Sequence, residues 1–331
     1  MKTYILFLFA LFSIISCKEK NTSSETEQSN TKESTLGDLY YGTGNVTQGL
    51  AETQIESLIN CNEKGSRISG VGIIKDTSGK SWTVPGTNHF NKASKAFDLY
   101  NECNNITPES LSEVDINTVP VYEVDADGDI ITGYIFADNY FELYINGKLI
   151  AIDPVPFTPF NSNIVKFKVK TPYTIAVKLI DWEEHLGLGS ENNRGKDFHP
   201  GDGGFIASFS DGTVTSSAWK AQTFYTAPIS DLSCLSEDGD KRLSKNCNTD
   251  GVDDGTSFYG IHWDIPEHIF DSTFDDSQWP NATPYTEDEI GVNNKKSYMN
   301  FIEKFSGVGA EFIWSTNVIL DNEVIVRYQV K

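Results

Sequence analysis

The chain has 331 residues, of which 38% are hydrophobic and 12% aromatic, and its formal net charge is −21. This composition excludes a wholly disordered chain, and the length leaves material for one large hydrophobic core or two smaller ones. A surface this acidic repels nucleic acid and anionic lipid headgroups. We therefore expect no nucleic-acid partner.

Residues 1–16 have the pattern of a secretory signal. Lys2 precedes a run of apolar residues that is too short to cross a bilayer as a helix. Residues 14–17 (IISC) resemble the lipobox of bacterial lipoproteins. The resemblance implies a signal peptide that is cleaved before Cys17, a lipid on the Cys17 side chain, and membrane attachment through that lipid.

Residues 17–38 are rich in Ser, Thr, Glu and Lys and hold almost no apolar side chains. Such a segment buries too little apolar surface to fold, so we expect a flexible tether. Lys18, Glu19 and Lys20 resemble the export signal of surface lipoproteins in Bacteroidetes. The expected location is the outer membrane, through the lipid anchor, with exposure at the cell surface left open.

Four cysteines remain if Cys17 is lipidated, and an even number in an exported chain predicts two disulfides. Three pairings are possible. The pairing that closes modest loops joins Cys61 to Cys103 and Cys234 to Cys247. The cysteines have no C-x-x-C spacing, so a zinc site built from them is not expected.

Short runs of β-branched and aromatic residues alternate with Gly, Asn and Asp turns from residue 39 onward. Residues 140–145 alternate in polarity, and Asn146-Gly147 follows as a hairpin turn signal. Short helices are expected only at 52–60 and 295–305. The pattern predicts an all-β antiparallel sandwich. Further strands are predicted at 69–74, 130–136, 164–169, 174–180, 204–209, 310–315 and 323–330.

Several segments are similar to galactose-binding-like jelly rolls. Residues 138–150 (DNYFELYINGKLI) resemble the strand–turn–strand element of that family, and 172–179 (PYTIAVKL) and 203–220 resemble further strands. Residues 274–282 (FDDSQWPNA) resemble a segment that is common in sugar-binding modules attached to glycoside hydrolases. Residues 310–327 look like the strand that usually follows it.

The resemblance covers residues 124–331 and implies a jelly-roll fold there. In the enzyme-attached modules the segment like 274–282 precedes the one like 138–150, whereas here it follows. The domain is therefore either permuted or built from two half-sandwiches. Residues 39–123 match no family we can name, and we expect a β-rich segment or cap of unknown type.

Asp125, Asp127 and Asp129 resemble the start of a calcium loop, because alternate carboxylates can converge on one hard cation. The pattern is not an EF-hand, since the positions that need Gly and Glu hold Ile130 and Phe136. A calcium site and a plain acidic turn both remain open. Ca²⁺ is the one cofactor that the sequence indicates.

Residues 181–185 (DWEEH) and 197–202 (DFHPGD) flank a glycine-rich loop. His185 and His199, with several carboxylates nearby, can ligate a metal or perform acid–base chemistry. The spacing matches no known metal motif, so a polar structural loop is the alternative. If the chain performs chemistry, we expect it in this region.

Exposed aromatic rings stack on the C–H faces of sugars, and acid or amide groups bond the hydroxyls. Trp219 and Trp314 lie within strand patterns and are expected to be buried. The candidates for ligand contact are Trp182, Trp263, Trp279, Tyr225 and Tyr259.

No catalytic motif is present. Asp275 and Asp276 are adjacent, so on a strand they would point to opposite faces and make a poor acid–base pair. We expect a non-catalytic, lipid-anchored carbohydrate-binding protein of the cell envelope. The alternatives are a structural subunit that binds an envelope protein in an outer-membrane complex, and a polysaccharide hydrolase with His185 or His199 in its site.

Overall fold

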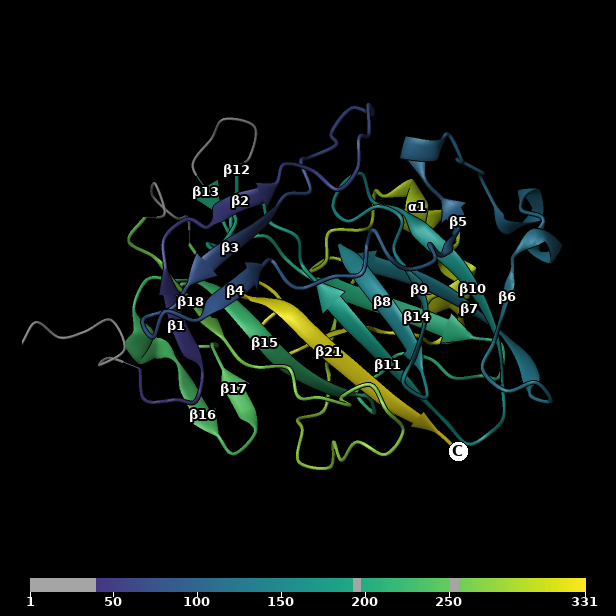
Figure 1. Cartoon of the computed structure of the whole chain (residues 1–331). Coiled ribbons are helices and arrows are strands. Elements are labelled where there is room, and N and C mark those ends of the chain that lie inside the picture. Colours follow the sequence, from purple (N-terminus) through teal and green to yellow (C-terminus); the bar gives the residue numbers. More distant parts are fainter. Residues whose placement is uncertain (1–39, 193–197, 251–255) are drawn as a thin grey trace, which may run out of the picture. The chain divides into compact units, whose positions relative to one another are not determined.

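The structure is a computed structural model that describes residues 40–192, 198–250 and 256–331. The predicted signal peptide, Cys17 and the rest of the predicted tether (17–38) lie outside the described residues. Within the described residues the protein is predominantly β, with several antiparallel sheets and only short helices (Figure 1). The predicted all-β class is confirmed.

The first large sheet has seven strands, and all its neighbouring strands are antiparallel. In spatial order they are β1 (Asn45–Gln48), β18 (Tyr259–His262), β15 (Lys220–Ile229), β21 (Asp321–Val330), β11 (Tyr173–Ile180), β8 (Tyr140–Ile145) and β9 (Lys148–Ile152). The turn between β8 and β9 is formed by Asn146 and Gly147, which both have positive φ, as the Asn-Gly signal predicts.

The second large sheet also has seven strands, and its pairs are antiparallel except for β6, which runs parallel to β10. In spatial order they are β19 (Thr283–Tyr285), β20 (Phe312–Trp314), β14 (Gly204–Phe209), β7 (Asp129–Asp138), β10 (Ser162–Val169) and β5 (Phe97–Tyr100), with β6 (Val121–Glu123) also on β10.

One hydrophobic core joins the two large sheets. Leu143 of β8 and Val177 of β11 belong to the same buried cluster as Phe205 of β14. Trp219 and Trp314 also lie in this cluster and are fully buried, which confirms the expectation for both. The two sheets therefore pack face to face and share one apolar interior.

Residues before 124 contribute strands to both large sheets, since β1 joins the first and β5 and β6 join the second. Disulfides link Cys61 to Cys103 and Cys234 to Cys247, so the predicted pairing is confirmed. Among the residues described, no helix has the length and apolar character needed to cross a bilayer.

The helix expected at 52–60 is not formed. Residues 52–55 form strand β2 (Glu52–Ile55), which pairs with β3 (Val71–Lys75) in a small sheet that also contains β4 (Ser81–Val84). Leu58 and Ile59 pack on a buried cluster, whereas Ile55 is exposed. The three apolar residues therefore do not form the buried face of a helix. The prediction at 295–305 is met by α1 (Lys296–Met299) and η6 (Ile302–Lys304).

The remaining elements have two or three residues each. They are the pairs β12 (Glu191–Asn192) with β13 (Phe198–His199) and β16 (Ser236–Asp238) with β17 (Lys241–Leu243), and the 3₁₀ helices η2 (Glu102–Asn104), η3 (Leu111–Glu113), η4 (Ile116–Thr118), η5 (Leu232–Cys234) and η7 (Ser306–Val308).

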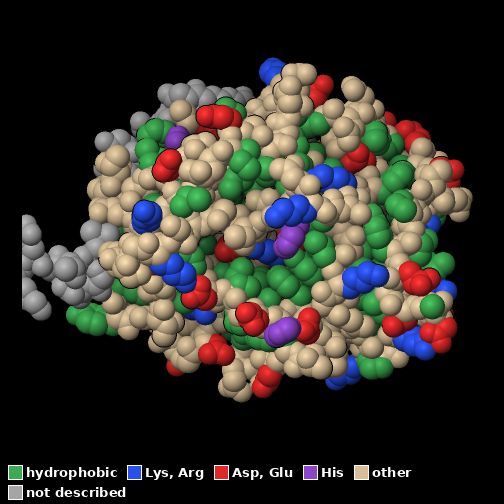
Figure 2. All heavy atoms as spheres, in the orientation of Figure 1, with side chains coloured by type: hydrophobic (Ala, Val, Ile, Leu, Met, Phe, Trp, Pro, Cys, Tyr) green, Lys and Arg blue, Asp and Glu red, His purple; other side chains and the backbone are tan. Residues whose placement is uncertain are grey.

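Side chains on the outer face of the first sheet are buried as well. Glu142 of β8 and Lys178 of β11 are 0% and 3% exposed. His89 covers this face with its Nδ1 2.8 Å from a Glu142 oxygen, and Phe270 stacks on Tyr144 with ring centroids 3.8 Å apart. Figure 2 shows this face hollowed over β8, β11 and β21, with hydrophobic side chains in the hollow and a histidine beside a cation at its rim.

Candidate functional site

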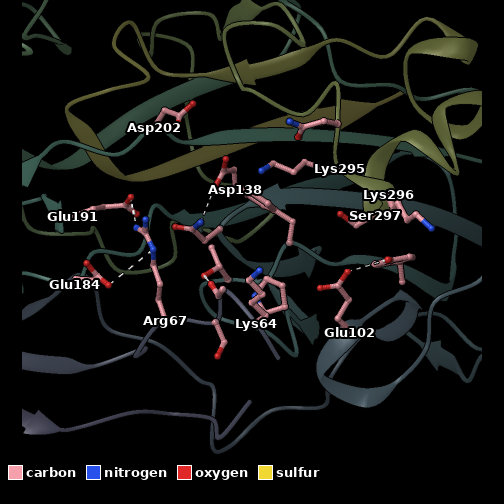
Figure 3. Close-up of a pocket in the computed structure, with 18 of the residues that line it drawn as sticks. Lys64, Arg67, Glu102, Asp138, Glu184, Glu191, Asp202, Lys295, Lys296 and Ser297 are labelled. Atoms are coloured by element: carbon pink, nitrogen blue, oxygen red, sulfur yellow. Dashed lines mark hydrogen bonds and ion pairs between the residues drawn. The ribbon is translucent and has the colours of Figure 1, made fainter. Parts of the chain in front are cut away.

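A pocket of about 600 Å³ opens where β7 ends and β8 begins (Figure 3). The chain passes here from the second sheet to the first through the Asp138–Asn139 peptide bond, which is cis. The volume is in the range of small-molecule sites. Polar side chains from separate segments make most of the wall: Lys64, Ser66, Arg67, Glu102, Asn139, Asp138, Thr158, Glu184, Glu191, Asp202 and Lys295, with Tyr100 and Phe160.

Asn139 joins the floor of the pocket to the segment that follows β11. Its Nδ2 donates to Asp138 Oδ1 at 2.6 Å, and its Oδ1 accepts the backbone N–H of Trp182 at 2.5 Å. Asp138 and Asn139 are both less than 5% exposed. These bonds hold the end of β7 against the end of β11 and fix where the Asp138 carboxyl group lies.

Four carboxyl groups gather at this junction. Asp181 follows β11, Glu191 lies in β12, and Asp202 precedes β14, while Asp138 ends β7. Burial raises the pKa of Asp138 and of Asp181, and the neighbouring carboxylates raise each further. Burial and the nearby Glu191 raise the pKa of Asp202 to about 6, and burial also raises the pKa of Glu191. A Cβ at Gly201 would lie 3.4 Å from Asp181 Oδ2, so the bare backbone passes close over this group.

The raised pKa values change what the pocket can do chemically. A protonated carboxyl group both donates and accepts hydrogen bonds, whereas an ionised one only accepts. Burial and the neighbouring carboxylates raise the pKa of Asp138 and Asp181 well above the ordinary value and so favour their protonated form. The cluster therefore offers donors as well as acceptors to a ligand.

Two cations balance the acids. Arg67 pairs through Nη1 with Glu191 Oε2, and its Nε lies 4.0 Å from Glu184 Oε1. The positive charge of Lys295 offsets part of the rise in the pKa values of Asp138 and Asp202, and Figure 3 shows its side chain reaching toward Asp138. The pocket is therefore mixed in charge rather than simply anionic.

The two predicted histidines lie in different surroundings. His199 Nδ1 is 2.9 Å from the Pro200 carbonyl, which can only accept, so Nδ1 carries the hydrogen in this assignment. Its Nε2 is buried and has no hydrogen-bond partner among the described residues, and the ring lies close enough to Asp202 to influence the pKa of that carboxyl group. His185 instead contacts Ser190 Oγ at 3.2 Å and lines a neighbouring pocket.

Trp182 and Trp263 are buried, and this corrects the expectation that they present ring faces to a sugar. Trp182 is 1% exposed and donates its indole N–H to the Gly70 carbonyl at 3.0 Å. Trp263 is 5% exposed and donates to Glu237 at 3.2 Å. Tyr140 packs against the Trp182 ring with centroids 5.7 Å apart, Arg242 lies 4.7 Å from the centroid of the Trp263 ring, and neither tryptophan lines the pocket.

The other aromatic candidates also lie outside the pocket. Tyr225 and Trp279 are buried, and Tyr259 lies in β18 beside the hydrophobic cluster that contains Trp263. The partly exposed aromatic ring at the pocket belongs to Phe160, which the sequence does not single out.

The predicted calcium loop is held by a lysine. Asp125 Oδ2 accepts the backbone N–H of Lys170 at 2.9 Å, Asp127 Oδ2 lies 2.6 Å from Lys170 Nζ, and Asp129 begins β7. Over residues 40–192, 198–250 and 256–331, no group of three or more His, Cys, Asp or Glu side chains is arranged to hold a metal ion. Calcium binding stays a prediction that these contacts do not favour.

Asp276 forms an ion pair that holds the fold together, in line with the expectation that two adjacent carboxylates make a poor acid–base pair. Its carboxylate lies 2.8 Å from Arg327 Nε, and Arg327 is only 2% exposed within β21. Asp275 accepts the backbone N–H of Ser277 at 3.0 Å in a local turn. The pair therefore anchors the loop before β19 to the first sheet.

Some residues of the pocket wall lie in segments that the sequence singles out. The predicted region of chemistry supplies Glu184 and Asp202 to the wall. In the sequence, Asp138 belongs to a segment that indicates the fold and not a binding site. Arg67 and Lys295 lie in polar segments that match no functional motif. Comparison with models of known protein families, with curated proteins and with solved structures finds no match in any of the three, so the function is inferred from the chemistry of the pocket.

Proposed function

We propose that this chain is a lipid-anchored protein of the cell envelope that binds carbohydrate, without cleaving it, in the pocket between the ends of β7 and β11. The proposal includes a sandwich of the galactose-binding-like jelly-roll type and anchoring at the outer membrane through Cys17. The observation that carries it is a pocket of about 600 Å³ whose wall is made mainly of hydrogen-bonding side chains. The DNY segment that resembles sugar-binding modules contributes Asp138 and Asn139 to that wall.

The pocket matches the chemistry of a sugar. Each hydroxyl group both donates and accepts a hydrogen bond, and the wall offers Arg67 and Lys295 as donors and Glu184 as an acceptor. The carboxyl group of Asp202, whose pKa is raised to about 6, changes between the two roles near neutral pH. Phe160 supplies an apolar surface for the C–H face of a pyranose ring.

Binding of purified polysaccharides to the full chain, by affinity electrophoresis and calorimetry, tests the proposal. Replacing Asp202 with Asn keeps the shape of the side chain and removes its acid function. We expect affinity to fall by about tenfold to a hundredfold, since a hydrogen bond to a charged group contributes about 1.5–3 kcal/mol. The control is Asp238→Asn, which makes the same charge change on the exposed part of β16.

The proposal fails if no polysaccharide or simple sugar binds the wild-type chain. It also fails as a site assignment if Asp202→Asn and Asp238→Asn bind equally well. Capture of a single envelope protein together with no retained glycan would instead favour the structural alternative.

Hydrolysis of polysaccharide is a second candidate function, because a carboxyl group with a raised pKa beside other carboxylates is what a general acid requires. Asp202 meets this description, with its pKa at about 6 and Glu191 nearby. A hydrolase of this kind would release reducing ends at a rate that falls as pH rises through about 6, and Asp202→Asn would abolish the release. Observing such cleavage would overturn the non-catalytic part of the proposal.

A further inference from the structure

A second pocket, of about 440 Å³, adjoins the first. Glu184 and Asn192 lie in the walls of both pockets. The chain segment that lines the first pocket at 64–67 continues along the second at Ile68 and Gly70. The same two segments therefore border both pockets, which we together call the groove.

Arg67 lies in the wall of the first pocket and reaches Glu184, a residue that both pockets share. It extends from one wall to Glu184 and Glu191 on the other, as Figure 3 shows. The guanidinium group has five N–H donors in a fixed plane, so two ion pairs leave donors for a ligand that lies against it. Arg67 is therefore placed to bond a group that passes from one pocket to the other.

The two pockets differ in chemistry. The first has carboxyl groups such as Asp138 and Asp202 in its wall. The second holds the apolar side chains of Ile68 and Leu186 among polar residues such as Glu56 and His185, and Ile68 is 62% exposed. A pyranose unit has both hydroxyl edges and apolar C–H faces, so the first wall suits the edges of one unit and the second wall suits the face of another.

We infer that the ligand is a carbohydrate chain of at least two units, with one unit in each pocket and the linkage between them beside Arg67. The inference rests on the proposed function, because it names the class of carbohydrate that the same site takes. It predicts that affinity depends on chain length, and that Ile68 contributes only when the second unit is present.

Calorimetry on the full chain tests the inference with glucose, xylose, galactose and N-acetylglucosamine, and with linear oligosaccharides of two to six units of each. For the sugar that binds, we expect the dimer or trimer to bind about tenfold more tightly than the monomer. Ile68→Ala should remove about threefold to tenfold of affinity for the oligosaccharides and leave the monosaccharide unchanged. Ile130→Ala is the matched control, since Ile130 is 55% exposed on β7 and lines neither pocket.

Hydrogen exchange gives a second measurement, in which an oligosaccharide should protect residues 64–70 and 184–192 together. Equal affinity for monomer and oligomers, or equal loss in Ile68→Ala and Ile130→Ala, overturns the inference while the proposed function stands. If none of the sugars binds while Asp202→Asn also has no effect on polysaccharide binding, the proposed function itself is wrong and the inference falls with it.

Discussion

Glu142 has no exposed surface, yet it is held as an anion by its neighbours. It accepts hydrogen bonds from the His89 ring at 2.8 Å, from Tyr144 at 2.8 Å and from Tyr140 at 3.0 Å. Burial opposes its charge, but the bonds to His89 and the nearby Lys178 hold its pKa below the ordinary value. A buried carboxylate of this kind is stable only because each neighbour is a donor or a cation.

Replacing Glu142 with Gln removes the charge that these donors and Lys178 require. We expect the free energy of unfolding to fall by about 2–4 kcal/mol at pH 6, measured by urea denaturation. The control is Glu109→Gln, which removes one partner of an exposed ion pair with Lys296 and should change stability little.

The pH dependence of this loss has a defined sign. The lowered pKa of Glu142 stabilises the fold above its ordinary value of 4.5, and the contribution is lost as pH falls. The raised pKa of His89 stabilises the fold below its ordinary value of 6.5, and that contribution is lost as pH rises through the raised pKa. The difference between wild type and Glu142→Gln should therefore be largest between these values, and a difference that is the same at every pH would contradict the assignment.

At the scale of elements, the β8–β9 hairpin shows how local chemistry sets a strand pair. Asn146 and Gly147 have φ values of 50° and 81°, as a two-residue turn with both residues left-handed requires. Strand β8 then places Leu143 in the core and Glu142 on the outer face. A shift of one residue would exchange these faces, so the turn also fixes where the buried charge lies.

Gly147→Ala tests the turn. A Cβ there would lie 2.3 Å from Asp271 Oδ1, and the positive φ adds strain for any residue with a side chain. We expect a loss of about 1–2 kcal/mol of stability in thermal or urea unfolding. Gly212→Ala is the matched control, because Gly212 has a φ of 91° and no atom within 4 Å of the added Cβ. An equal loss in both variants would mean that the contact with Asp271 contributes nothing.

At the scale of the molecule, the buried carboxyl groups at the end of β11 lower the free energy of unfolding. Asp181 belongs to a buried cluster in which burial and other carboxylates raise its pKa. The folded state then keeps a proton that the unfolded chain has already lost, so this group lowers stability as pH rises from its ordinary value toward its raised one. The carboxyl cluster beside the pocket therefore reduces the stability of the fold, as is common at binding sites.

Asp181→Asn should make the protein more stable at pH 7, by about 1–3 kcal/mol, because Asn never ionises. The gain should vanish near pH 3, where the native carboxyl group is protonated in both states. The control is Asp231→Asn, since a bond from the Ser233 N–H lowers the pKa of that exposed residue and the expected change has the opposite sign. Lower stability of Asp181→Asn at pH 7 would contradict the electrostatic account of the pocket.

The sequence by itself determines the β class and the β8–β9 hairpin, because strand periodicity and turn residues act over short stretches of chain. It predicts two disulfides and favours the observed pairing, but the structure decides among the three possible pairings. The structure alone decides which residues share the pocket. Arg67, Asp138 and Lys295 are far apart in sequence, and they meet only because the fold brings the segment before β3 and the segment before α1 to the end of β7. It also decides that Trp182 is buried, since exposure depends on what long-range packing places over a side chain.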